Sequence, residues 1–115
     1  MYYIYCITNL PENRRYIGVT RSPRDRVRAH LQGNNELSSD IEILGRENFL
    51  YEVLETTSSP EAAGEKELHW VKLFGTLSPS RGYNIQNGGF SKYRNTLRKH
   101  TAGRFPTYGL LSELF

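Results

Sequence analysis

A guanidinium and an imidazole stand four residues apart in the stretch YIGVTRSPRDRVRAH, which runs from Tyr16 to His30. Pro23 favours the first turn of a helix, and on a helix Arg26 and His30 share one face. An arginine suits bidentate contact with a phosphate, and a histidine can relay a proton near neutral pH. The spacing therefore indicates a site for phosphate chemistry.

Two short aromatic runs precede this helix. The runs 2–7 and 15–18 flank a polar loop that contains Pro11, a pattern that predicts a β-hairpin. Tyr5 and Tyr16 are expected to lie side by side on one face of that hairpin. A phenol has an ordinary pKa near ~10, so it serves as a base only where cations or a hydrogen-bonded histidine lower that pKa.

These residues resemble those of the GIY-YIG nucleases. Tyr3-Ile4-Tyr5 stands in the GIY place, Tyr16-Ile17-Gly18 in the YIG place, and Arg26 and His30 in the places of the helical Arg and His. The resemblance covers roughly residues 1–90. In one departure, Tyr3 replaces the glycine of GIY.

Glu67 and Asn84 extend the resemblance. Glu67, three residues before Trp70, resembles the family's helical metal-ligand glutamate, and Asn84 in GYNI resembles its closing asparagine. Mg²⁺ keeps several waters and takes phosphate oxygens as ligands, so one carboxylate is sufficient in principle. Mg²⁺ is thus the expected cofactor, with Mn²⁺ as a substitute. Taken alone, Glu67 reads as one of several exposed helix glutamates, such as Glu65.

The resemblance also implies roles. Tyr5 is expected to be the general base for water, with His30 relaying the proton and Tyr16 orienting water or phosphate; the order of the tyrosines is open to reversal. Arg26 is expected to bind the scissile phosphate, and Asn84 to brace the site. Each residue has an ordinary reading when taken singly, as a core aromatic, an exposed arginine or a turn asparagine. The joint pattern is what carries specificity.

The net charge of +3 is unevenly distributed. Residues 12–30 hold six arginines against two carboxylates, residues 91–115 hold five basic residues against one, and residues 31–90 are acidic. Two basic blocks around an acidic middle predict contact with a polyanion, here DNA, although ordinary solvated charge is the alternative. The candidate DNA contacts are Arg14, Arg15, Arg21, Arg24, Arg28, Lys92, Arg94, Arg98 and Lys99.

The 115 residues predict one α/β (α+β) domain with a three-stranded antiparallel sheet flanked by helices. Helices are expected over 23–31, 37–44 and 60–74, and a third strand over 49–54. No stretch approaches ~20 consecutive apolar residues, no secretion signal is evident, and the single Cys6 cannot form an internal disulfide. A cytoplasmic protein without membrane contact is the expectation.

Gly88-Gly89 indicates a boundary, so we expect a catalytic domain over 1–90 and a basic extension over 91–115 for DNA contact or docking. The apolar end, 110–115, is expected to pack on the domain or on a partner chain. The expected function is Mg²⁺-dependent hydrolysis of DNA by a small free-standing, homing-type or phage-like endonuclease, as a monomer or transient homodimer. The alternatives are a non-catalytic nucleic-acid-binding module and a subunit of a larger nuclease complex.

Overall fold

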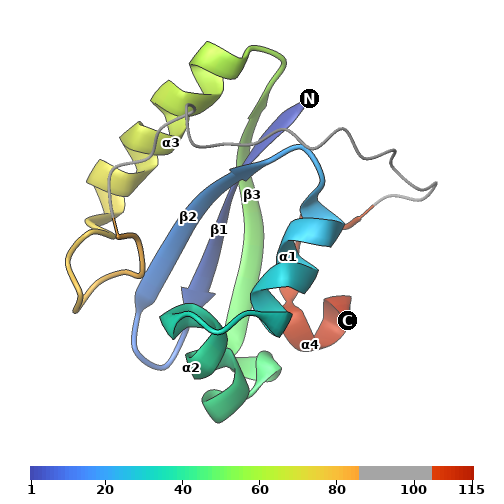
Figure 1. Cartoon of the computed structure of the whole chain (residues 1–115), viewed down its shortest axis with the longest axis vertical. Coiled ribbons are helices and arrows are strands. Elements are labelled where there is room, and N and C mark those ends of the chain that lie inside the picture. Colours follow the sequence, from blue (N-terminus) through green and yellow to red (C-terminus); the bar gives the residue numbers. More distant parts are fainter. Residues whose placement is uncertain (86–104) are drawn as a thin grey trace.

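The computed structural model describes residues 1–85 and 105–115, in which one sheet carries helices on both faces (Figure 1). The strands run antiparallel in the order β2-β1-β3-β4. The elements are β1 Tyr2–Asn9, β2 Arg14–Thr20, α1 Pro23–Gln32, α2 Glu36–Leu44, the 3₁₀ turn η1 Arg46–Asn48, β3 Phe49–Thr57, α3 Pro60–Phe74, β4 Tyr108–Leu110 and α4 Leu111–Leu114.

The mixed α/β fold and its antiparallel sheet are confirmed, but the sheet has four strands rather than three. The added strand, β4, pairs with β3 and comes from the segment expected to be part of an extension. A three-residue strand shows no alternation long enough to detect in a sequence. Leu111, which follows β4, is fully buried against the same core as Tyr5, so the apolar end packs on its own domain.

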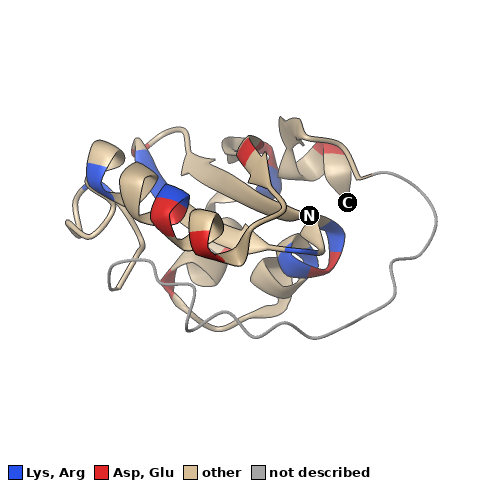
Figure 2. Ribbon diagram, turned by 90° about the horizontal axis from the view of Figure 1, so that it is seen from above, with Lys and Arg blue, Asp and Glu red and all other residues tan. Residues whose placement is uncertain are grey.

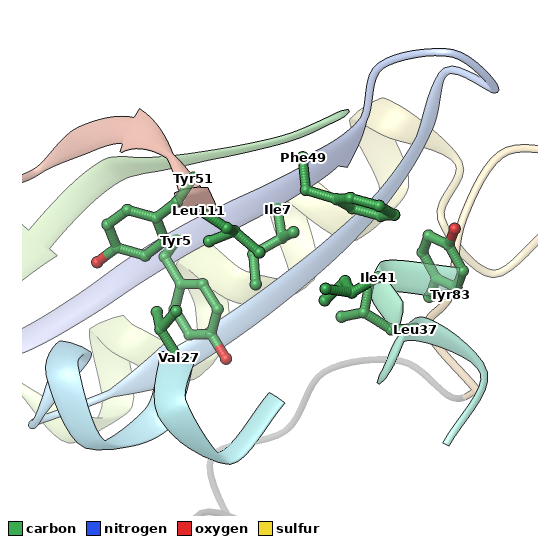
Figure 3. Close-up of a cluster of buried hydrophobic side chains, with 9 residues drawn as sticks. All are labelled: Tyr5, Ile7, Val27, Leu37, Ile41, Phe49, Tyr51, Tyr83 and Leu111. Atoms are coloured by element: carbon green, nitrogen blue, oxygen red, sulfur yellow. The ribbon is translucent and has the colours of Figure 1, made fainter. Parts of the chain in front are cut away.

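The alternation of side chains along the strands divides the core into two layers. The layer under α1, α2 and α4 contains the nine buried residues of Figure 3, among them Tyr5, Val27 and Leu111. The opposite layer lies under α3 and contains Ile4, Cys6, Ile17, Ala63 and Val71, among others. Cys6 is therefore a buried apolar residue, as a strand position in a core predicts.

Local signals account for the limits of α3. The Ser59 hydroxyl accepts a hydrogen bond from the Ala62 amide at 3.1 Å, and Pro60 occupies the first turn. Gly75 ends the helix with φ 65°, a left-handed conformation that glycine adopts without steric cost. Within residues 1–85 and 105–115, no helix has the length and apolar character needed to span a membrane.

Candidate active site

Tyr5, Tyr16, Arg26 and His30 come together between the β1–β2 hairpin and α1. In the hairpin register Tyr5 lies opposite Gly18 and Ile7 opposite Tyr16, so both phenols project from the same face. Arg26 Nε donates to Tyr5 Oη at 3.3 Å, and Arg26 Nη2 donates to Tyr16 Oη at 3.5 Å. The His30 ring lies edge-on to the Tyr16 ring, with the centroids 4.9 Å apart.

The Tyr5 hydroxyl takes part in two hydrogen bonds. Tyr5 Oη lies 2.8 Å from His30 Nε2, and it already accepts a bond from Arg26, whose guanidinium only donates. When the imidazole carries its proton on Nδ1, Nε2 accepts the phenolic proton of Tyr5; when the proton is on Nε2, the phenol oxygen accepts that bond through its second lone pair. The arrangement links the Tyr5 hydroxyl directly to the His30 ring.

The electrostatics of the cluster keep both Tyr5 and His30 neutral. Burial, together with the nearby Arg26 cation, lowers the pKa of His30 to about 3, so the imidazole is neutral at physiological pH. Burial and the neighbouring Tyr16 raise the pKa of Tyr5 well above its ordinary value. The two phenols raise the pKa of Arg26, Tyr5 having the larger effect, so the guanidinium stays charged.

Exposure differs sharply among these groups. Tyr5 has no exposed surface, Tyr16 is half-buried, and Arg26 is exposed. A water or phosphate from solvent thus reaches Arg26 and Tyr16 before it reaches Tyr5. Of the two phenols Tyr16 is the nearer to solvent, and the role of Tyr5 as the base stays a prediction.

Gly18 provides the space that the Tyr5 ring occupies. A Cβ at this position would lie 2.5 Å from Tyr5 Oη, closer than real side chains approach. The close approach of strand and ring therefore requires glycine here. Tyr3, which stands where the family has glycine, is half-buried and lies between Thr20 and Thr56 on the neighbouring strands, whose small side chains leave room for it.

Asn84 braces β2 beside Tyr16. Its Oδ1 accepts from the Ile17 amide at 2.9 Å, and its Nδ2 donates to the Ile17 carbonyl at 3.0 Å. The side-chain amide thus pairs with both backbone groups of one residue, as a neighbouring strand would. Asn84 acts on the site through the backbone of β2.

Glu67 projects from α3, the helix that packs on the opposite face of the sheet. It lies midway between Ala63 and Val71 on one stripe of the helix, and these two residues are buried against β1 and β2. Glu67 is half-buried on this inward stripe. A carboxylate among core-facing positions is unusual in a helix and distinguishes Glu67 from the exposed Glu65.

The described side chains could support a metal ion with few protein ligands. Among the residues that the structure describes, no three His, Cys, Asp or Glu side chains are grouped so as to hold a metal. Mg²⁺ commonly uses one or two carboxylates and fills its shell with water and phosphate oxygens. Glu67 fits such an ion as its protein ligand.

Arg14, an expected DNA contact, lies in a separate network with acidic partners. Its guanidinium lies 3.0 Å from Glu36, 3.4 Å from Asp40 and 3.6 Å from Glu12, and its side chain is only 11% exposed. It also stacks on the Tyr83 ring at 4.0 Å. These carboxylates neutralise the positive charge of Arg14 and so weaken its attraction for a phosphate.

Tyr83 and two other residues of this network have no sequence signal that singles them out. The buried Asn9 donates to the Tyr83 hydroxyl at 2.9 Å, and that hydroxyl donates to Asp40 at 2.7 Å. The network anchors residues 82–84 beside β2. The hydrogen bonds that join Asp40 and Tyr83 to the rest of the network span 26 to 74 residues of the chain, so no local pattern reveals them.

The other expected DNA contacts fall into two groups. Within the described residues, Arg15, Arg21, Arg24 and Arg28 each lie over an aromatic ring, at 4.6 to 5.5 Å from its centroid. Figure 2 shows the basic positions spread over several elements rather than along one of them. Lys92, Arg94, Arg98 and Lys99 lie outside the described residues, and DNA binding by either group stays a prediction.

Comparison with known proteins identifies the family. Residues 1–84 match the family described as "GIY-YIG catalytic domain". A solved structure, the catalytic domain of the intron endonuclease I-TevI in a glutamate-to-alanine mutant form, is similar with a TM-score of 0.65 and 23% identity, covering 78% of this chain and 99% of that one. No curated protein gives a significant match. The chain belongs to the GIY-YIG family and carries its catalytic domain, a nuclease domain.

Proposed function

We propose that this protein is a metal-dependent DNA endonuclease whose active centre is the cluster of Tyr5, Tyr16, Arg26 and His30, joined around the edge strand β2 by Glu67 from the other face of the sheet. The observation that carries the proposal is the setting of Arg26. The residue is exposed, its partly buried guanidinium donates to two phenols, and no carboxylate of the described residues lies within ion-pair distance of it. It therefore retains its charge for an anionic ligand.

A phosphodiester is the anion that this setting fits best. The planar fork of Arg26 can contact two phosphate oxygens, and charge that develops on the phosphate during hydrolysis would meet a fixed cation. The half-exposed Tyr16 is the phenol placed to contact the attacking water. In this proposal Tyr5 positions Arg26 and His30, which reverses the order of the tyrosines expected from the sequence.

Glu67 is proposed as the ligand of Mg²⁺, with Mn²⁺ as a substitute. When bound, such an ion supplies Lewis-acid stabilisation of the phosphate and of the leaving oxygen. Glu67 contributes a carboxylate held on the inward stripe of α3, and Asn84 holds β2 in register beside Tyr16. One centre cuts one strand, so a monomer is expected to nick DNA and a transient homodimer to cut both strands.

Similarity to an intron endonuclease supports a homing-type or phage-like enzyme as the proposed class. The alternative of a subunit in a larger nuclease complex loses its proposed docking segment, because Leu111 is buried in the chain's own core. The remaining alternative is a binding module that retains the fold without the chemistry.

Cleavage of supercoiled plasmid tests the proposal. Wild type and Glu67→Ala are each incubated with Mg²⁺ and with EDTA. Nicked circles that form only with wild type and Mg²⁺ support the proposal, and prompt linear product indicates two cooperating protomers. DNA that is bound but left intact across several divalent metals would overturn the enzyme and favour the binding module.

A further inference from the structure

The C-terminal segment, residues 105–115, lies beyond the family match and reaches the active centre through a row of aromatic rings. The Phe115 ring lies 5.6 Å from Phe105, Phe105 lies 5.6 Å from Tyr51, and Tyr51 lies 5.9 Å from Tyr5, all between centroids. Figure 3 shows Tyr51 and Leu111 beside Tyr5 in the same layer. The end of the chain is thus in packing continuity with the phenol that bonds to His30.

Tyr51 depends on packing for its position. Its hydroxyl is buried and has no hydrogen-bond partner among the described residues, so no polar contact fixes its ring. Its cross-strand neighbour on β4 is Gly109, which offers no side chain. Phe105, packed edge-on at 69°, is therefore a principal contact that holds Tyr51 against Tyr5.

The same segment also contacts α1, the helix that carries Arg26 and His30. The Arg24 guanidinium lies 5.4 Å above the Phe105 ring, and that of Arg28 lies 5.5 Å above Phe115. Residues two apart on a helix differ by about 200° in direction, so Arg26 projects from nearly the opposite side of α1. The helix is held on one side by the segment and on the other by the two phenols.

We infer that residues 105–115 position the catalytic face, with Phe105 as the central positioning residue. Phe105 sets the place of the Tyr5 ring through Tyr51 and the rotation of α1 through Arg24. The inference rests on the proposed nuclease function and extends it to a part of the chain that the family match does not include.

Phe105→Ala removes the ring that joins these contacts. We expect kcat per folded molecule to fall about 10- to 100-fold, because small misplacements of catalytic groups cost rates of that order. KM should stay unchanged, and Phe105→Tyr, which keeps the ring, should restore kcat. Two controls separate positioning from folding. Tyr108→Ala alters an exposed side chain of the same segment, and Val71→Ala weakens the core on the other face.

The experiment combines plasmid nicking, corrected for the folded fraction by thermal melting, with the ¹⁵N spectrum of the His30 ring. Wild type should show the pattern of a neutral ring hydrogen-bonded at Nε2, and Phe105→Ala should shift that pattern whereas the two controls should not. Wild-type kcat with an unchanged His30 spectrum in Phe105→Ala would overturn the inference while the nuclease stands. A loss of kcat equal to that in Val71→Ala would also overturn it. If wild type fails to cut DNA, the proposed function fails, and the His30 spectrum alone decides for or against positioning.

Discussion

Arg14 of β2 and Arg26 of α1 both contact tyrosine side chains, but they differ in their other partners. Arg14 faces Glu12, Glu36 and Asp40 and is almost fully covered. Arg26 donates to two phenols and is exposed. The first cation is offset by its surroundings and holds elements together, whereas the second is held in place without being neutralised. Fixing a cation with neutral acceptors keeps its charge for a ligand.

Substitution of two glycines should give the largest difference between the Arg26 cluster and the Arg14 network. Gly18→Ala would place a Cβ 2.5 Å from Tyr5 Oη, so the ring must leave Arg26 and His30. We expect kcat to fall about 100-fold or more. Gly82→Ala would instead place a Cβ 2.2 Å from the Thr76 backbone, near the Arg14 network, and should mainly lower the melting temperature. A wild-type kcat in Gly18→Ala would contradict the claim that the Arg26 cluster serves catalysis and the Arg14 network serves stability.

Arg14→Ala should act on stability. Removing the guanidinium leaves the partly buried Asp40 beside two other carboxylates and exposes the Tyr83 face. The expected loss is about 2–3 kcal/mol in the free energy of unfolding, less than for a fully buried pair because Glu12 and Glu36 are well exposed. Urea unfolding measures it. An unchanged unfolding midpoint would show that the network adds nothing to stability.

His30 should make stability depend on pH. Its pKa is near 6.5 when unfolded and about 3 when folded, so below pH 6.5 the unfolded chain binds a proton that the folded chain excludes. The free energy of unfolding is therefore unaffected by His30 above pH 6.5 and falls as the pH decreases from 6.5 toward 3. At pH 5 the loss is about 2 kcal/mol relative to neutral pH. His30→Gln is the control, and its unfolding free energy should fall less between pH 7.5 and 5. Parallel curves for the two proteins would contradict the neutral, buried imidazole.

A carboxylate introduced next to Arg26 should neutralise its charge, as the acidic neighbours of Arg14 do. Ala29 is exposed and three residues beyond Arg26 on α1, so Ala29→Glu can form an ion pair on the helix surface. We expect cleavage to slow about tenfold with little change in stability, because an exposed pair contributes at most about 1 kcal/mol. Ala29→Gln keeps the size without the charge and should cleave like wild type. Equal rates for the two variants would indicate that the charge state of Arg26 is irrelevant.

Much of the fold follows from local patterns. Pro23, Ser59 and Gly75 mark helix ends, and the aromatic alternation of the hairpin places Tyr5 and Tyr16 on one face. The joint order of the site residues was sufficient to indicate the family. These signals are visible because each depends on neighbours in the sequence.

The remaining features depend on contacts between distant parts of the chain. Nothing near Arg14 or Arg26 in the sequence predicts that only Arg14 meets Asp40 and Glu36. The three residues of β4 are too few to show a period, and the burial that sets Tyr5 behind Tyr16 arises from packing of α1 and α4 on the sheet. Exposure and ion pairing therefore had to come from the structure.

Plasmid nicking by Arg26→Ala and Arg14→Ala, each corrected for the folded fraction, tests the central claim most directly. We expect Arg26→Ala to lose about 10²–10³-fold in kcat with an unchanged melting temperature, as for removal of one donor to a transition-state oxyanion. Arg14→Ala should melt earlier but cut at the wild-type rate per folded molecule. Equal losses of kcat in both variants, or a loss confined to Arg14→Ala, would contradict the assignment of Arg26 to the scissile phosphate.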